Sequence, residues 1–212
     1  FYTLLIIFLT TMNNYNFKNV NLFKIKNIEV NGFSKNKNTI IASEAKHVIE
    51  KNIFFLKKKY FIKLKERNDT KYLNIKKKYP NELIVNITPA KPLCIIIYQN
   101  NKFFLGDNGK KLDFQVKENN MPIVKGSKNI NNIFKLVNLI KLSNLDYSRI
   151  TKINFFKSGR FDISLDNGTI IKFPIKYNQE IINYSSDLLF DKKFANSKII
   201  DLRIKNRIIK YE

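Results

Sequence analysis

YPNELIVNI, at residues 79–87, places a turn directly before an alternating strand. Its Pro-Asn pair favours the turn, and Leu83, Val85 and Ile87 would lie on one face of the strand that follows. The preceding run, Lys71 to Tyr79, is expected to be the partner strand. The apolar face of this pair must be covered by other elements, so we expect helices to pack on it.

Upstream of this pair, the sequence predicts a strand and then a helix. The strand is expected within residues 23–30, ahead of an Asn-Gly pair that favours a turn. An apolar stripe with helical spacing follows at Ile41, Ala45, Val48 and Ile49. These positions predict a helix of about 12 residues, and Asn38 is its expected N-cap.

A second, shorter helix is predicted at Tyr60 to Glu66. Three of its apolar side chains are expected to face the core, namely Phe61, Ile62 and Leu64. The order along this part of the chain is then β-α-α-β-β. A three-stranded sheet with both helices on one face would bury its Ile and Val side chains in a domain of about 65 to 70 residues. Pro89 and Pro92 mark its expected boundary.

Beyond this boundary, short strands alternate with turn sequences. Strands are expected at residues 94–98, 102–105, 121–124, 150–156, 161–165, 169–173, 199–204 and 207–211, and helices at 133–140 and 179–189. Ser-Gly and Asp-Asn-Gly sequences between the strands favour hairpins. This half is therefore predicted to be a mixed, mostly antiparallel sheet with flanking helices, and the whole chain to be α+β.

The charge of the chain is strongly positive. Its 39 Lys and Arg residues outnumber 17 Asp and Glu residues, which gives a net charge of +22. The lysines are spread along the whole chain, so they are expected to form a solvated surface, while a functional basic patch stays open as the second interpretation. A hydrophobic fraction of 44% excludes a disordered chain.

Residues that support catalysis or metal binding are scarce. His47 is the only histidine, and Cys94 is the only cysteine and lies in an apolar run where burial would raise its pKa. The glycines stand singly, without the spacing of a phosphate-binding loop. We therefore expect no catalytic residue, no cofactor, no metal site and no small-molecule substrate.

The N-terminal run FYTLLIIFL, residues 1–9, is apolar and precedes a polar stretch. Residues 1–12 are interpreted as the C-terminal part of a transmembrane anchor, because nine residues are too few to cross a bilayer that needs about 20. The absence of a small-residue cleavage site favours an anchor over a signal peptide. A buried N-terminal strand or helix stays open as the alternative.

Five segments form a pattern when they are taken in order. They are KNIEVNG at 26–32, YPNELIVNI at 79–87, LGDNG at 105–109, MPIVKG at 121–126, and IDLR at 200–203 with Arg207. Together they resemble the FtsQ/DivIB family of bacterial cell-division proteins over nearly the whole chain. Pro89 and Pro174 depart from the family pattern, which affects the expected geometry of two turns.

The resemblance implies a POTRA domain at residues 23–92 and an FtsQ-type β domain at 93–212. It also implies a single-pass protein of the bacterial inner membrane, located at the division septum with most of the chain in the periplasm. Such a protein is a non-enzymatic scaffold that recruits FtsB and FtsL and does not bind nucleic acid. Other division proteins are candidate partners of the POTRA domain.

The resemblance further implies that the strand after the Asp-Leu-Arg motif contacts FtsB. The partner-binding residues expected from this are Arg203, Ile204, Asn206, Arg207, Ile208, Ile209, Lys210 and Tyr211. A strand at the edge of a sheet offers unpaired backbone groups that a partner strand can extend. Ile208 and Ile209 must face opposite sides, so one of them is expected in the core, and which one stays open.

One local feature and two other functions complete these expectations. Asp201 and Arg203 are two residues apart on a strand and are expected to form a structural pair. POTRA modules also occur in secretion and outer-membrane assembly proteins, which gives one alternative function. A basic nucleic-acid-binding protein is the other alternative, and its binding would fall steeply as salt rises.

Overall fold

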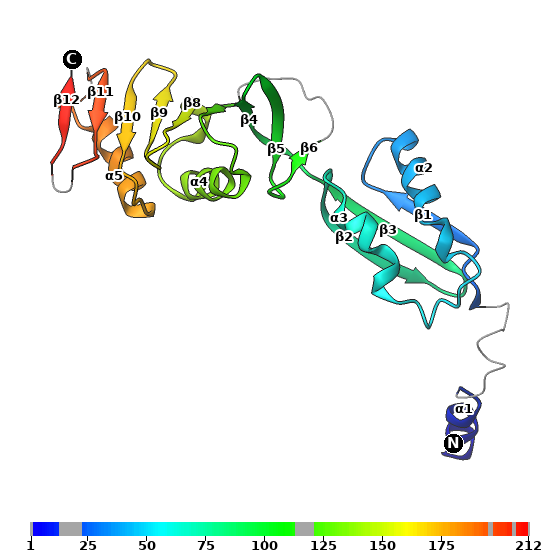
Figure 1. Ribbon diagram of the computed structural model, residues 1–212. Coiled ribbons are helices and arrows are strands. Elements are labelled where there is room, and N and C mark those ends of the chain that lie inside the picture. The colour runs from blue at the N-terminus through cyan, green and yellow to red at the C-terminus, as the bar shows by residue number, and fades with distance from the viewer. Residues whose placement is uncertain (1, 13–22, 113–120, 195–196, 205–206, 212) are drawn as a thin grey trace. The chain divides into compact units, whose positions relative to one another are not determined.

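The chain divides into two compact units, Phe1–Ala90 and Lys91–Glu212, in a computed structural model (Figure 1). The structure describes residues 2–12, 23–112, 121–194, 197–204 and 207–211. The division falls at residues 90 and 91, whereas the sequence places the boundary at 92 and 93. None of the helices in the described ranges has both the length and the apolar character that a membrane crossing requires.

The first unit contains an N-terminal helix and a small α+β fold. Its elements are α1 (Tyr2–Met12), β1 (Asn27–Asn31), α2 (Lys35–Glu44), η3 (Lys46–Val48), η4 (Lys58–Phe61), α3 (Ile62–Glu66), β2 (Thr70–Lys78) and β3 (Glu82–Pro89). The three strands form one sheet in the order β1-β3-β2. β3 is parallel to β1 and antiparallel to β2, so the predicted β-α-α-β-β order and three-stranded sheet are confirmed.

One face of this sheet carries the helices and the core of the unit. Leu83, Val85 and Ile87 alternate along β3 and are buried against the helical residues Ile41 and Leu64. Complete burial of an aliphatic side chain of this size stabilises the fold by about 1.5–3 kcal/mol. The period-two pattern of β3 thus places the helices on the predicted face.

Three details of the helices differ from the prediction. The stripe that predicts one helix of about 12 residues is divided between α2 and η3, and Ile49 lies after η3. Ser34, rather than Asn38, is the N-cap of α2. Asn38 lies inside the helix, where its side chain accepts a hydrogen bond from the backbone N–H of Phe33 and donates one to the carbonyl oxygen of Phe33. Ile62 is 47% exposed and does not face the core, whereas Phe61 and Leu64 are buried as predicted. Ile62 begins α3 directly after η4, so its direction depends on a junction that apolar spacing does not define.

The second unit contains a nine-stranded sheet and two long helices. Its elements are β4 (Pro92–Tyr98), β5 (Asn101–Gly106), β6 (Lys111–Leu112), β7 (Ile123–Lys125), α4 (Ile130–Leu142), η5 (Tyr147–Arg149), β8 (Ile150–Phe155), β9 (Phe161–Leu165), β10 (Ile170–Phe173), α5 (Gln179–Phe190), β11 (Ile199–Asp201) and β12 (Ile209–Tyr211). The strand order is β12-β11-β10-β9-β8-β7-β4-β5-β6.

Five of the strand pairs in this sheet are antiparallel and three are parallel. The predicted mixed, mostly antiparallel sheet and the α+β class are therefore confirmed. β7 lies between β4 and β8 and is parallel to both, so two chain crossovers meet at this short strand.

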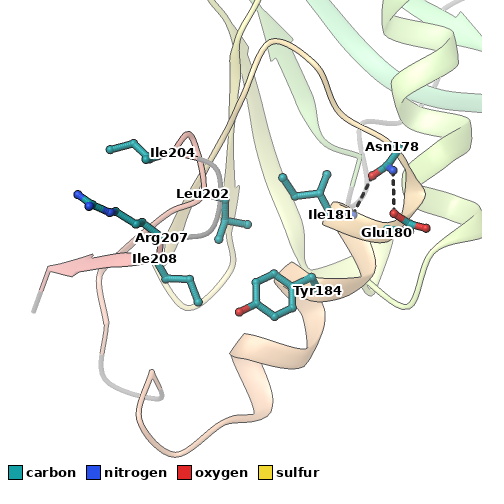
Figure 2. Close-up of a pocket in the computed structure, with 8 residues that line it drawn as sticks. All are labelled: Asn178, Glu180, Ile181, Tyr184, Leu202, Ile204, Arg207 and Ile208. Carbon is teal, nitrogen blue, oxygen red and sulfur yellow. Dashed lines mark hydrogen bonds between the residues drawn. The ribbon is translucent and has the colours of Figure 1, made fainter.

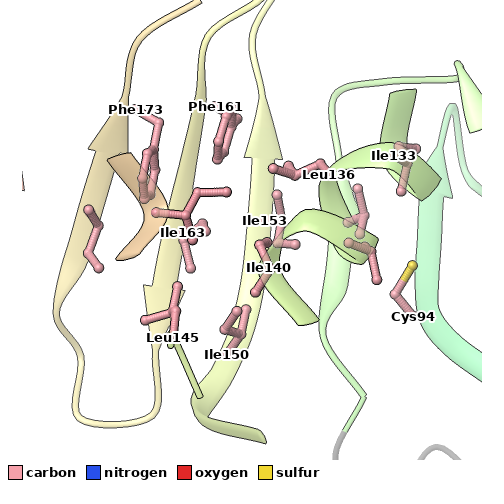
Figure 3. Close-up of a cluster of buried hydrophobic side chains, with 14 of the residues drawn as sticks. Cys94, Ile133, Leu136, Ile140, Leu145, Ile150, Ile153, Phe161, Ile163 and Phe173 are labelled. Carbon is pink, nitrogen blue, oxygen red and sulfur yellow. The ribbon is translucent and has the colours of Figure 1, made fainter. Parts of the chain in front are cut away.

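The helices α4 and α5 pack against one another and on the same apolar side of the sheet. Phe161, Ile163 and Phe173 project from β9 and β10 into this core, and Ile133 and Ile140 of α4 contact it from the helical side (Figure 3). The polar residues that alternate with them along the strands lie on the opposite face. Along β8 to β10 the helices therefore cover one side of the sheet, whereas on β4 and β5 side chains of the other side are buried as well, such as Ile95 and Phe104.

Candidate functional site

The C-terminal strand forms one end of the nine-stranded sheet. β12 pairs with β11 in antiparallel register, with Ile199 opposite Tyr211 and Asp201 opposite Ile209. No strand within the described residues pairs with the other side of β12. The outer margin of β12 is therefore a sheet edge that can accept another strand.

The strand at this edge is shorter than the sequence suggests. β12 contains only Ile209, Lys210 and Tyr211 of the expected partner-binding residues. Arg203, Ile204, Arg207 and Ile208 lie in the connection between β11 and β12, and Asn206 lies outside the described residues. The two strands predicted at 199–204 and 207–211 are both present but shorter, because β11 ends at Asp201 and the chain leaves the sheet before it returns at Ile209.

This connection and α5 form the two walls of an apolar groove of about 480 Å³ (Figure 2). The groove is lined by Asn178, Glu180, Ile181, Tyr184, Leu202, Ile204, Arg207 and Ile208. Figure 2 shows the ring of Tyr184 directed toward Ile208. Tyr184 is 46% exposed and Ile204 is 50% exposed, so apolar surface remains available for a partner.

Two polar residues of the groove, Asn178 and Glu180, are held at the N-terminal end of α5. The Asn178 side chain accepts a hydrogen bond from the Ile181 backbone N–H at 3.1 Å and donates one to Glu180 at 3.0 Å. This is an N-cap, which fixes the first turn of the helix that carries Ile181 and Tyr184. The groove wall is therefore anchored at the helix terminus.

A second hollow, of about 410 Å³, lies on the opposite side of the C-terminal strands. It is lined by Ser158, Arg160, Pro174, Ile175, Asp201, Arg203, Ile204, Ile209 and Tyr211. Ile209 and Tyr211 share one face of β12 because side chains alternate along a strand. Ile208 is instead half-buried and packs against the core cluster beside α5, so Ile208 is the one of the pair that faces the core.

The structure thus distributes the predicted residues over two faces. Ile208 and Arg207 belong to the groove beside α5, whereas Arg203, Ile209 and Tyr211 belong to the open-face hollow. Ile204 lines both. Sequence reasoning missed several lining residues that lie outside the C-terminal segment, namely Ile175, Ile181 and Tyr184. Ile181 and Tyr184 are spaced i and i+3 on α5, but this spacing is shared by the buried side of the helix.

Asp201 and Arg203 form the predicted pair. The Arg203 guanidinium donates to both Asp201 carboxylate oxygens, with Nε at 2.8 and 3.0 Å, and the Arg203 backbone N–H donates to Asp201 at 3.1 Å. These bonds from Arg203 hold the pKa of the Asp201 carboxyl below its ordinary value, against the opposing effect of burial. The pair therefore fixes the chain where it leaves β11.

We expect Asp201→Asn to destabilise the second unit by about 1–3 kcal/mol at pH 7, because charged hydrogen bonds are lost in a buried position. A lowered pKa means that the stabilisation is complete above about pH 4 and is lost as the pH falls through the lowered value. The difference between wild type and variant should therefore shrink in acid. Urea unfolding followed by circular dichroism at pH 7 and at pH 3 measures it.

Asp187→Asn is the matched control, because Asp187 is an exposed acid on α5. Its effect should stay below about 0.5 kcal/mol at both pH values. An equal effect of the two substitutions at pH 7 would contradict a structural role for the Asp201 bonds.

The only cysteine and the only histidine of the sequence, Cys94 and His47, are both held in the fold by burial or hydrogen bonds. Cys94 is completely buried in the core of the second unit, and this burial raises its pKa to about 12. Both ring nitrogens of His47 lie within 3.0 Å of backbone carbonyl oxygens, those of Glu44 and Tyr60. Within the described ranges, no group of three or more His, Cys, Asp or Glu side chains could hold a metal ion.

No protein-family model and no curated protein matches the chain. One solved structure that is similar is the major extracytoplasmic domain of the trans isomer of the bacterial cell division protein DivIB from Geobacillus stearothermophilus. The likeness covers 47% of this chain and 91% of that chain, with 12% identity and a TM-score of 0.37. A likeness at this level carries no argument about function.

Proposed function

We propose that the chain is a non-enzymatic scaffold of bacterial cell division that binds a partner polypeptide along its C-terminal edge. The observation that supports this best is the open edge of β12 beside an apolar groove. The order of five FtsQ/DivIB-like segments along the sequence supports the division role. In this proposal the apolar helix α1 attaches the chain to the inner membrane, and the rest of the first unit and the second unit lie in the periplasm at the division septum.

The edge and the groove can act together on one partner segment. A strand added to β12 would form backbone hydrogen bonds with it, which fix the register of the segment. Because alternate side chains of a strand face opposite sides, one set could enter the groove beside α5 and the other the open-face hollow. β12 has only three residues, so the two hollows must contribute most of the affinity.

The charges around the edge indicate the chemistry of the partner. Arg207 lines the groove, Arg160 and Arg203 line the open-face hollow, and Lys210 lies on β12. Arg203 is already paired with Asp201, but the surroundings remain positive overall. We therefore propose that the partner segment is acidic and carries alternating apolar residues, and by the family resemblance that it belongs to FtsB or FtsL.

We expect Ile204→Asp, made in the full chain, to weaken binding of the soluble FtsB and FtsL extracytoplasmic segments by about tenfold or more. The variant places a negative charge at the residue that lines both hollows, and a loss of 1.4 kcal/mol corresponds to a factor of ten. Tyr184→Asp on the groove wall should have a similar effect. Calorimetric titration of wild type and variants with each segment measures these affinities.

Phe190→Asp is the matched control for Tyr184→Asp. Phe190 is also on α5 and is 80% exposed, but it does not line the groove. The affinity of the Phe190→Asp variant for the FtsB and FtsL segments should equal that of wild type. If Ile204→Asp and Tyr184→Asp remain folded by circular dichroism and bind as tightly as Phe190→Asp, the proposed site is wrong.

Removal of residues 205–212 tests the edge together with one wall of the groove, because the deletion eliminates β12, Arg207 and Ile208 and leaves α5 in place. Binding should be lost while the far-ultraviolet circular dichroism of the remaining chain is retained. Unchanged binding by this shortened chain would exclude strand addition at β12 as the mode of recognition.

A further inference from the structure

Three separate segments of the first unit meet at one end of its sheet. The segment before β1 pairs with residues 50–53, since the Ile53 N–H donates to the Phe23 carbonyl at 2.9 Å and the Ile25 N–H to the Lys51 carbonyl at 3.0 Å. The turn between β2 and β3 joins them, because the Lys26 N–H donates to the Asn81 carbonyl at 2.8 Å. These bonds give this end a fixed backbone.

The fixed backbone displays a cluster of aromatic rings, which we call the aromatic end and define as Phe23, Phe54, Phe55 and Tyr79. The Phe54 ring stacks on Tyr79 at 5.1 Å between centroids and meets Phe23 edge to face at 4.9 Å. Phe54 is 43%, Phe55 49% and Tyr79 55% exposed. Large apolar rings are thus held in water although the core of the unit lies next to them.

Lysines surround the aromatic end. Residues 23–26, 50–55 and 76–82 contain six lysines and two glutamates, so their net charge is +4. The two glutamates already pair with two of the lysines, Lys24 with Glu50 at 3.9 Å and Lys78 with Glu82 at 2.7 Å. Lys77 donates to the Phe54 carbonyl at 3.3 Å, which places an ammonium group beside the rings. Exposed rings bordered by ammonium groups suit a binding surface that has anionic groups on its outside and an apolar layer beneath them.

The path of the chain relates this end to α1. Ten residues separate α1 from Phe23, so Phe23 can be at most about 40 Å from Met12. Along α1, apolar side chains are exposed, with Leu4 at 73% and Ile6 at 58%. Ala90, at the opposite end of β3, leads into the second unit.

We propose that the aromatic end lies against the anionic lipid headgroups of a membrane. Tyr79, Phe54 and Phe55 would enter the interfacial region, and the neighbouring lysines would contact lipid phosphates. A single-stranded nucleic acid is less well suited, because base stacking needs open ring faces and one face of Phe54 is already covered by Tyr79. The proposal uses the proposed membrane attachment of α1 and is independent of the C-terminal partner site.

The absence of tryptophan from the chain allows a direct test. Tyr79→Trp puts a single indole in the aromatic end. Tyr72→Trp is the control, because Tyr72 is 66% exposed on β2 and also has a lysine near its ring, with Lys71 Nζ at 5.4 Å. Each full-length variant is bound to vesicles of phosphatidylglycerol and phosphatidylcholine that contain lipid brominated near the headgroup, and tryptophan quenching is measured.

We expect the brominated lipid to quench Trp emission in the Tyr79→Trp variant and to leave the Tyr72→Trp variant unquenched. Added Lys24→Gln, Lys26→Gln and Lys77→Gln substitutions should remove the quenching, as should vesicles of pure phosphatidylcholine. High salt should reduce the quenching, since the distance over which exposed charges act is about 8 Å at 0.15 M salt and becomes shorter at higher salt.

Four outcomes would overturn the proposal. If the chain binds the vesicles in a flotation assay but neither variant is quenched, α1 attaches the chain and the aromatic end does not touch lipid. If the two variants are quenched equally, the aromatic end is not the surface that selectively contacts lipid. If the chain fails to float, membrane attachment fails as well. If a single-stranded oligonucleotide changes Trp emission of the Tyr79→Trp variant and vesicles do not, the surface binds nucleic acid. Partner binding in solution, measured separately, is unaffected by all four.

Discussion

Phe161→Ala should lower the free energy of unfolding of the second unit by about 3–5 kcal/mol. Phe161 is completely buried in the centre of the sheet-and-helix core. Its ring stacks on Phe173, with 4.8 Å between centroids and an interplanar angle of 9°, and meets Tyr177 edge to face at 4.8 Å. Removal of the ring would leave a cavity among residues from β9, β10 and the segment before α5.

The size of the effect follows from the rigidity of these surroundings. Both aromatic neighbours are attached to paired strands or to the start of a helix, so they cannot move far into the space. Cavity formation therefore adds to the loss of buried apolar area, and the aromatic pairs contribute about 0.5–1.5 kcal/mol beyond that area. A total at the upper part of the range is expected.

Urea unfolding followed by circular dichroism measures this difference, with Phe156→Ala as the matched control. Phe156 is 38% exposed and its ring contacts Arg160, whose guanidinium carbon is 4.9 Å from the ring centroid. Its removal should cost about 1 kcal/mol or less. Comparable losses in the two variants would mean that Phe161 is not the centre of this core.

The secondary structure could be predicted where apolar periodicity is long. α4 carries Ile133, Leu136, Val137 and Ile140 at i, i+3, i+4 and i+7, and all four are buried. The strands β8 to β10 alternate over four to six residues and are separated by turn sequences, so their limits agree with the sequence within one residue. In these elements, local pattern and tertiary burial point the same way.

The arrangement of strands could not be predicted in the same way. β7 has three residues, and its position between β4 and β8 depends on two crossovers rather than on its own side chains. At the C-terminus, Ile208 and Ile209 are chemically identical, and the presence of α5 on one side makes Ile208 the one that packs against the core. The candidate site therefore follows from packing that the sequence does not specify locally.

The aromatic end could not be predicted from the local sequence either. Phe54 and Phe55 are adjacent apolar residues, and in the sequence they resemble buried positions as much as surface ones. Their exposure depends on the pairing of residues 50–53 with the segment before β1, which involves residues about 30 positions apart. The lysines nearby come from three segments, and only those at 76–78 form a run in the sequence, so the sequence alone does not gather the patch.

Gly126→Ala is expected to destabilise the second unit by about 2–5 kcal/mol. Gly126 follows β7 and has a φ of +84°, where an L side chain costs about 1–2 kcal/mol. A Cβ at this position would also lie 1.9 Å from the Phe155 carbonyl oxygen at the end of β8. Because this neighbour is backbone, the end of β7 must move away from β8, which adds about 1–3 kcal/mol.

Gly168→Ala separates these two contributions. Gly168 has nearly the same φ, +85°, in the hairpin between β9 and β10, but a Cβ there would meet nothing within 4 Å. It should therefore cost only the 1–2 kcal/mol or so of the left-handed backbone. Hydrogen exchange should be faster in the β7 and β8 peptides of Gly126→Ala and unchanged there in Gly168→Ala. If Gly126→Ala and Gly168→Ala lose the same stability and show the same exchange in β7 and β8, the close approach of Gly126 to the Phe155 carbonyl is not needed for the pairing of β7 with β8.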